Sequence, residues 1–244
     1  MMKYGIQMFS VRDTAEHDLH AALQSVAELG YKNVEFAGFF GHPAEEVKGW
    51  LSELGLTASG THTMLDALDA DFDGVVAYHK AIGCDTLIVP YSDPKTQAEL
   101  SELVSRMNHY QQKLAQSGIT LGYHNHAHEF APIEGGRTIL EALIADTAVQ
   151  LEIDTFWVYA AGQSPVEWMQ RLHDLHRLPV IHIKDGLASH EGKPLGLGTA
   201  PVAAVYAKAL ELNVPMVVES ETLTPSGADE ARVCMAYLKT LESK

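Results

Sequence analysis

The stretch TLIVPYSDPKTQAELSELVSRMNHYQQKLAQSGITLGYH, residues 86–124, contains the repeating unit that decides the fold. It opens with the short apolar run 86–89, continues with a helical pattern over about 97–116, and ends with a second apolar run at 119–124. Strands buried on both faces read as continuous apolar runs, and a helix between two such runs returns the chain so that they lie parallel. The stretch therefore predicts a strand–helix–strand unit of a parallel sheet.

The same alternation runs along all 244 residues. Strands are expected at about residues 4–9, 34–37, 56–61, 86–89, 119–124, 149–153, 180–183 and 215–219. The helices that follow them are expected at about residues 19–29, 43–54, 75–82, 97–116, 138–145, 164–175, 201–212 and 228–241. Eight units in about 250 residues are typical of a TIM barrel. We therefore expect an α/β protein with one (β/α)₈ barrel domain over residues 1–244.

An open doubly wound sheet is the alternative architecture. It would show fewer units, or a GxGxxG pattern after the first strand. The first expected strand leads instead into Ser10-Val11-Arg12-Asp13, which contains no glycine. The barrel is the better interpretation.

Charge and composition exclude several classes of partner. The 32 Asp and Glu residues outnumber the 17 Lys and Arg residues, giving a net charge of −15 with His neutral. Such a surface repels phosphate backbones, so we expect no nucleic-acid partner. No run approaches the ~20 apolar residues of a membrane span, and residues 1–5 lead into a strand without a signal-peptide core. We expect a cytoplasmic protein, and a homo-oligomer is compatible with the sequence.

Carboxylates and imidazoles gather where the expected strands end, which is the active-site face of such barrels. A charged group buried without a partner is costly, so these groups must pair, stay hydrated or bind a metal. The late strands together supply oxygen and nitrogen ligands suited to Mn²⁺, with Mg²⁺, Co²⁺ or Zn²⁺ as alternatives. The residues concerned are Glu35, His62, His124, His126, Glu129, Glu152, Asp154, His182, Lys184, Glu219 and Glu221.

Strand alternation narrows the choice, because side chains two residues apart share a face. His182 is the natural ligand on the seventh strand, and Lys184 reaches the same pocket one pleat higher. Asp154 lies nearer the mouth than Glu152, and Glu219 lies closer to the body of its strand than Glu221. His124 and His126 share a face on the fifth strand, with Glu129 just beyond it in the loop.

Several segments resemble those of the xylose-isomerase-like sugar phosphate isomerase/epimerase superfamily. They are residues 123–130 (YHNHAHEF), 152–157 (EIDTFW), 182–185 (HIKD) and 196–198 (GLG), and the similarity runs through the chain from residues 7–12 (QMFSVR) onward. The resemblance implies a (β/α)₈ barrel that binds one divalent metal through Glu, Asp, His and Glu on strands five to eight. Members include ketose 3-epimerases, inosose dehydratases and enzymes acting on 3-keto sugars.

Carried over residue by residue, the resemblance implies Glu129, Asp154, His182 and Glu219 as metal ligands. In the ketose epimerase branch the first ligand lies within the fifth strand, where this sequence has His124. The branch with an HNH segment matches Glu129 instead, so both residues stay candidates. This departure also weakens transfer of the epimerase mechanism, which needs two opposed glutamates as acid and base.

The remaining roles are assigned from position. We expect Glu129, Glu219, His126 and Lys184 to take part in catalysis, and Glu35, His62, His124 and Lys184 to bind substrate. The alternatives are that His124 and His126 only orient the ligands, and that Lys184 forms a salt bridge with Asp185.

The expected chemistry starts with a sugar or keto-sugar chelated through adjacent carbonyl and hydroxyl oxygens. Chelation stabilises the enediolate formed when a Glu or His removes the proton beside the carbonyl. Returning the proton gives an isomerase or epimerase, which is the first hypothesis. Expelling a β-hydroxyl or glycosyl group gives a dehydratase or lyase on an inosose or 3-keto glycoside, the second hypothesis. A sugar-binding barrel without catalysis is the third. A nuclease is disfavoured because the sequence shows no basic groove.

Overall fold

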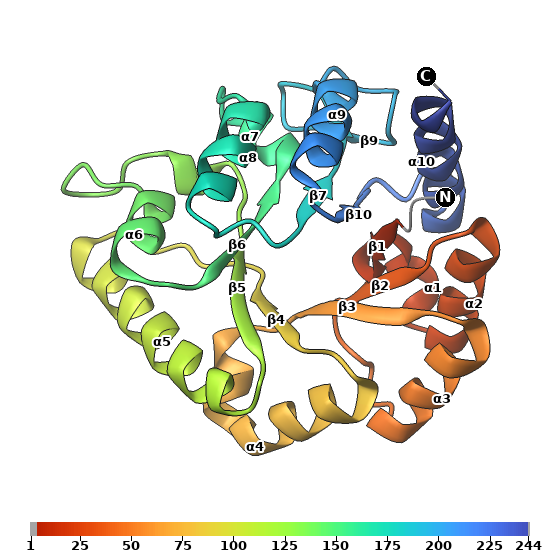
Figure 1. The fold of residues 1–244 in the computed structure, drawn as a ribbon, viewed down its shortest axis with the longest axis horizontal. Helices are drawn as coiled ribbons and strands as arrows, with labels where there is room; N and C mark the ends of the chain where they lie inside the picture. The colour runs from red at the N-terminus through yellow and green to blue at the C-terminus, as the bar shows by residue number, and fades with distance from the viewer. Residues whose placement is uncertain (1–3, 244) are drawn as a thin grey trace.

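Eight parallel strands close into a barrel in this computed structural model, which describes residues 4–243. Figure 1 shows the strands at the centre and the helices around them. The order around the barrel is β1-β10-β7-β6-β5-β4-β3-β2, so the first and last strands are neighbours. The strands are β1 (Gly5–Gln7), β2 (Asn33–Phe36), β3 (Thr57–His62), β4 (Thr86–Val89), β5 (Thr120–His124), β6 (Gln150–Asp154), β7 (Ile181–Ile183) and β10 (Met216–Val218). The predicted fold class is confirmed.

The long helices cover the outside of the barrel. They are α2 (Leu19–Leu29), α3 (Ala44–Leu54), α4 (Leu65–Ile82), α5 (Gln97–Gln116), α6 (Ile139–Asp146), α8 (Pro165–Asp174), α9 (Val202–Leu212) and α10 (Gly227–Glu242). Helix α5 begins with a capping box in which Thr96 and Glu99 satisfy each other's backbone N–H groups. Its buried face, with Leu103, Met107 and Leu114, packs into the main apolar core.

Helix α4 starts at Leu65, earlier than the sequence pattern predicts. Its backbone leaves the helical region at Asp71, and the Asp71 carboxylate accepts a hydrogen bond from the N–H of Gly74. Asp71 thus caps a second helical segment inside α4, and the predicted helix at 75–82 corresponds to that segment.

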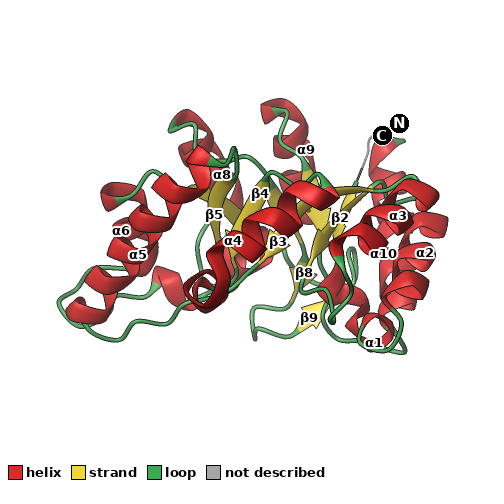
Figure 2. Ribbon diagram, turned by 90° about the horizontal axis from the view of Figure 1, so that it is seen from below, coloured by secondary structure: helices red, strands yellow, loops and turns green. Residues whose placement is uncertain are grey.

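Short elements that the sequence did not indicate follow the carboxyl ends of four strands. They are η1 (Met8–Val11) with α1 (Arg12–Ala15), η2 (His128–Phe130), α7 (Thr155–Ala160), and the hairpin of β8 (Asp185–Gly186) and β9 (Gly192–Lys193). Figure 2 shows α1 and the hairpin on the same side of the barrel. Strand β1 therefore ends at Gln7, where the expected strand continued to residue 9.

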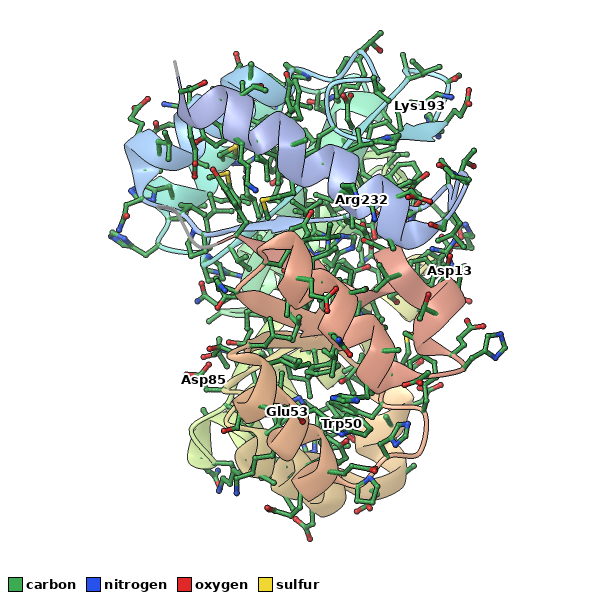
Figure 3. All side chains as sticks on the ribbon, turned by 90° about the vertical axis from the view of Figure 1, so that its right-hand side faces the viewer. Asp13, Trp50, Glu53, Asp85, Lys193 and Arg232 are labelled. Atoms are coloured by element: carbon green, nitrogen blue, oxygen red, sulfur yellow. The ribbon has the colours of Figure 1, made fainter. Side chains whose placement is uncertain are left out.

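Helices α1 and α10, near the two ends of the chain, pack against each other outside the barrel. The Asp13 carboxylate in α1 accepts a hydrogen bond from the N–H of Gly227 at the start of α10, in the region viewed in Figure 3. Residue 227 must be glycine at this contact, because a Cβ atom would overlap the carbonyl oxygen of Ser10. At the other end of α10, Tyr4 donates a hydrogen bond to Glu242 across 2.9 Å.

Cys84 and Cys234 are both buried, and neither forms a disulfide. Burial raises the pKa of the Cys84 thiol to about 11 and that of the Cys234 thiol to about 12. Within residues 4–243, the helices are too short or too polar to cross a membrane.

Candidate metal centre

Four buried side chains converge at the carboxyl end of the barrel. They are His124 at the end of β5, Asp154 at the end of β6, His182 in β7 and Glu219 just after β10. One ligand atom from each lies within 4.8 Å of the others. The pairing of Asp154 with His182 in the register of β6 and β7 brings their side chains to the same level. This group is called the upper cluster below.

The distances within the upper cluster suit a shared ion. His124 Nε2 lies 3.1 Å from His182 Nδ1 and 3.6 Å from Asp154 Oδ2. His182 Nδ1 lies 3.4 Å from Glu219 Oε2. Burial first of all, and then the neighbouring His182 and His62, hold the pKa of His124 well below its usual value. His124 is therefore neutral, which is the form that binds metals.

The Asp154 carboxylate shows that the upper cluster fits a cation. Its Oδ1 caps helix α7 by accepting the N–H groups of Phe156 and Trp157 at 2.8 and 3.0 Å. Its Oδ2 is buried and has no hydrogen-bond partner anywhere in residues 4–243. A buried oxygen without a hydrogen-bond partner costs free energy unless a bound ion or water satisfies it. Because α7 holds the carboxylate in place, Oδ2 is presented to the space between the two imidazoles.

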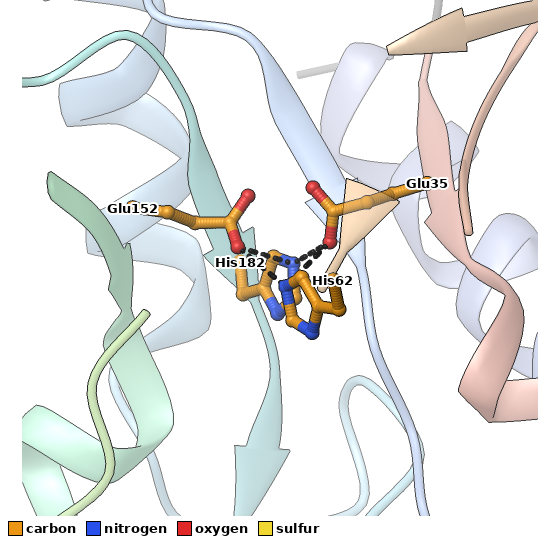
Figure 4. A group of neighbouring side chains, drawn as sticks. All are labelled: Glu35, His62, Glu152 and His182. Carbon is orange, nitrogen blue, oxygen red and sulfur yellow. Dashed lines mark hydrogen bonds and ion pairs between the residues drawn. The ribbon is translucent and has the colours of Figure 1, made fainter. Parts of the chain in front are cut away.

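His182 joins the upper cluster to a second group one layer deeper, which Figure 4 shows. In this lower cluster, His182 Nε2 lies 2.8 Å from Glu35 Oε1 and 3.2 Å from Glu152 Oε2. Burial alone would lower the pKa of His182, but the two carboxylates raise it well above its usual value and favour a proton on Nε2, so an ion that displaces the other proton would bind at Nδ1. Carboxylate partners of this kind orient metal-binding histidines and raise their basicity.

His62 completes the lower cluster. Its Nε2 lies 2.9 Å from both Glu35 Oε1 and Glu152 Oε2. Burial alone would lower the pKa of His62, but the two carboxylates raise it to about 9. Gln7 Nε2 also donates to Glu35 Oε1 across 2.6 Å. The lower cluster is therefore a network of charge-assisted hydrogen bonds beneath the upper one, in which the buried Glu152 Oε1 makes no hydrogen bond to the described residues.

Lys184 is buried beside the upper cluster. Its ammonium lies 3.0 Å from Glu219 Oε2, 2.6 Å from Glu221 Oε1 and 3.7 Å from Asp154 Oδ2. Burial alone would lower the pKa of Lys184, but the carboxylates, Glu219 foremost, hold it above its ordinary value. Lys184 is therefore a cation at the edge of the site.

Asp185, the alternative partner expected for Lys184, has another role. Its carboxylate accepts hydrogen bonds from the N–H groups of Gly186, Gly196, Gly198 and Ala200. Position 198 must be glycine there, because a Cβ atom would overlap the Asp185 carboxylate. The Gly-Leu-Gly segment is thus a tight loop tied to the end of β7.

Glu129 lies in a third group, with His126 and His128. Its Oε1 accepts a hydrogen bond from the Tyr123 hydroxyl at 2.9 Å, and its Oε2 accepts the N–H of His126 at 2.7 Å. Glu129 lies beyond the end of β5, in the turn η2. This turn directs its carboxylate back toward Tyr123 of β5. His124, on the strand itself, takes the fourth place in the upper cluster. Ligation by Glu129 stays a prediction, and the geometry favours the alternative, His124.

A cavity of about 350 Å³ opens over the upper cluster, and we call it the catalytic cavity. Of the residues predicted to bind substrate or act in catalysis, His62, His124, His126 and Glu219 line it. Glu35 is buried beneath, in the lower cluster, and Glu129 lies behind His126. Three exposed apolar side chains at the rim were not predicted from the sequence. They follow the ends of strands or a short loop and are Phe9, Met64 and Tyr91, exposed by 40, 46 and 43%.

Comparisons with known proteins agree with this architecture. The family model described as xylose isomerase-like TIM barrel matches residues 23–241. A sugar phosphate isomerase/epimerase from Parabacteroides distasonis is 23% identical, with 98% of each chain covered and a TM-score of 0.83. A probable 3-DHS dehydratase from Bacillus anthracis is 16% identical, with 98% of this chain and 99% of that chain covered and a TM-score of 0.75.

A D-allulose 3-epimerase from Methylomonas sp. is 17% identical, with 98% of each chain covered and a TM-score of 0.71. At these identities the three structures establish a shared fold. No curated protein matches the chain.

Proposed function

Because the chain belongs to the xylose isomerase-like TIM barrel family, we propose that it is a divalent-metal-dependent isomerase or epimerase of a small sugar or keto-sugar. The family and the structural neighbours are mostly enzymes, and they include isomerases and epimerases of sugars. The single observation that carries the metal dependence is the buried Asp154 Oδ2, which makes no hydrogen bond within residues 4–243 and faces the imidazole of His124 and the Lys184 ammonium.

The proposed ligands are His124, Asp154, His182 and Glu219. Two carboxylates and two imidazoles form a hard to borderline donor set, for which Mn²⁺ is the first choice. These side chains would hold a divalent ion that could polarise a carbonyl and a neighbouring hydroxyl of the substrate and so acidify the C–H bond beside the carbonyl.

The side chains around the ligands supply the remaining chemistry. The Lys184 ammonium can donate a hydrogen bond to a substrate oxygen and stabilise the negative charge of an enediolate. His126 lines the catalytic cavity, and burial lowers its pKa to about 3, so its imidazole is neutral and can accept a hydrogen bond from a substrate hydroxyl. Glu221 also lines the cavity, and burial raises the pKa of its carboxyl group. Glu221 is the proposed proton carrier, and His126 is the proposed hydrogen-bond partner of a substrate hydroxyl.

Isotope exchange tests this proposal. The protein, loaded with Mn²⁺, is incubated in D₂O with a panel of ketoses, inososes and 3-keto glycosides, and the products are followed by mass spectrometry and NMR. We expect deuterium at a carbon next to the carbonyl, with the molecular formula otherwise retained, and loss of exchange after treatment with a chelator.

Two other outcomes would replace the proposal. Loss of water or of a glycosyl group would make the protein a dehydratase or lyase that uses the same deprotonation. Exchange that survives complete metal removal, or a protein that binds no Mn²⁺ in a titration, would exclude the metal-dependent mechanism.

A further inference from the structure

A second cavity, of about 550 Å³, adjoins the catalytic cavity, and we call it the outer cavity. Its lining consists of ring-bearing side chains and alanines, without a carboxylate, lysine or arginine among the described residues. This composition is unusual in a chain with a net charge of −15. The rings belong to Tyr91, His126, His128, Phe130, Trp157 and His190.

The rings form a connected wall. The centroid of Tyr91 lies 5.5 Å from that of His126, and the His126 centroid lies 5.6 Å from that of Trp157. The Trp157 centroid lies 5.9 Å from that of His190. The Lys184 ammonium lies 5.0 Å from the centroid of Trp157, so this ring also borders the upper cluster. Aromatic faces suit the apolar face of another ring, and imidazoles can donate to or accept from hydroxyl groups.

The two cavities are continuous at Tyr91 and His126, which line both. One ligand can therefore have one part over the upper cluster and another part in the outer cavity. The His126 ring, at this boundary, makes no hydrogen bond to the part of the chain that the structure describes. Its ring is free for a ligand.

A third cavity, of about 620 Å³, adjoins the catalytic cavity at His62 and Met64, but its polar groups are already paired. Tyr78 donates to the carbonyl oxygen of His42, and His79 Nε2 lies 2.6 Å from the Thr61 hydroxyl. The Asp71 carboxylate caps Gly74. The outer cavity is therefore the better place for a hydroxylated or aromatic ring.

We propose that the substrate is a glycoside of a sugar or keto-sugar that keeps its carbonyl, with the carbonyl-bearing sugar in the catalytic cavity and a second ring, joined through the glycosidic oxygen, in the outer cavity. This inference rests on the proposed function and names its substrate class. The second ring is neutral, because the described lining of the outer cavity offers no charged partner apart from imidazoles. The same chemistry admits a second sugar or an aryl group, which the test separates.

Equilibrium binding tests the proposal without requiring turnover. The Mn²⁺-loaded protein is titrated calorimetrically with D-glucose, cellobiose and phenyl β-D-glucopyranoside. We expect at least one two-ring ligand to bind tenfold or more tightly than glucose, and the stronger of the two identifies the second ring as a sugar or an aryl group. Equal affinity for glucose and both two-ring ligands would overturn the proposal.

A filling variant locates the second ring. Ala161 lines the outer cavity and lies outside both clusters, so Ala161→Phe should remove the tenfold preference while glucose affinity stays within twofold. Ala161→Ser keeps the volume and should keep the preference, and Ala160→Phe, at a second lining position, serves if Ala161→Phe does not fold. Preference that survives a folded filling variant would overturn the proposal.

The outcome is separable from that of the proposed function. Deuterium exchange in free ketoses together with equal binding of one-ring and two-ring ligands would leave the proposed function standing and remove the glycoside. A binding preference that is abolished by Ala161→Phe, with no exchange in any substrate, would support the two-ring site and remove the isomerase or epimerase.

Discussion

The two faces of strand β6 are built for different purposes. Leu151 and Ile153 are fully buried in the apolar core between the barrel and its helices. Glu152 and Asp154 alternate with them, and they are just as buried, in the lower and upper clusters inside the barrel. Burial of apolar surface stabilises the fold, whereas burial of a carboxylate costs free energy that its partners must offset. One face of the strand holds the structure together, and the other maintains a reactive set of groups.

A substitution of the proposed ligand Asp154, on the inner face of β6, should reduce activity most strongly. Asp154→Asn keeps an oxygen that can cap α7 but removes the carboxylate charge. We expect activity to fall by about 10³-fold, since a bound ion contributes several kcal/mol to the reaction. The Tm should stay close to that of the wild type. Steady-state kinetics and thermal unfolding of the metal-free proteins measure the two effects, and undiminished activity would remove Asp154 from the ligand set.

The neighbouring residue on the outer face should behave in the opposite way. Ile153→Ala leaves a cavity in the apolar core, and we expect the free energy of unfolding to fall by about 2–5 kcal/mol. Mn²⁺ affinity of the folded variant should change little, because Ile153 is not in either cluster. Urea unfolding and metal titration at low temperature make the comparison with Asp154→Asn. A loss of Mn²⁺ affinity without a loss of stability would contradict the distinction between a stabilising outer face and a metal-binding inner face.

A substitution in the lower cluster, also on the inner face of β6, should reduce activity less than Asp154→Asn does. Glu152→Gln keeps the shape of the side chain but removes the charge beside His182 Nε2. We expect Mn²⁺ affinity to fall by about 10–100-fold, as for other outer partners of metal-binding histidines. Much of the activity should return at saturating Mn²⁺, which distinguishes this variant from Asp154→Asn. Wild-type metal affinity would show that the lower cluster does not support the upper one.

The smallest effect is expected far from the barrel interior. Thr96→Ala removes the hydroxyl that caps α5 and should lower the free energy of unfolding by about 1 kcal/mol. Metal affinity and activity should be those of the wild type, so this variant is the control for general destabilisation. Reduced metal affinity would mean that the clusters respond to small changes in stability.

Strand position and parity could be predicted from the sequence, and depth within the barrel could not. Alternation correctly placed Asp154, His182 and Glu219 together, because side chains of one parity share a face. Glu35 and His62 were expected to bind substrate, yet Glu35 lies with Glu152 one layer down. Depth depends on how neighbouring strands are staggered, as when His124 pairs with Glu152 while Asp154 pairs with His182.

The surroundings of the site were less predictable than its centre. The outer cavity is built on α7, η2 and the segment after β4, which have no long periodic pattern. Trp157, which follows the Asp154 strand end directly, lies in the lining of that cavity. The choice between His124 and Glu129 also depended on a turn, since η2 directs Glu129 away from the upper cluster.

His182 belongs to both clusters, with one ring nitrogen facing each. The carboxylates of Glu35 and Glu152 contact its Nε2 in the lower cluster, and neither carboxylate lines the catalytic cavity. The electron density that this imidazole offers to an ion can therefore be adjusted by residues that no substrate reaches. Substitutions at these two positions can therefore adapt such a barrel to another metal, or to another strength of carbonyl polarisation, without changing the lining of the catalytic cavity.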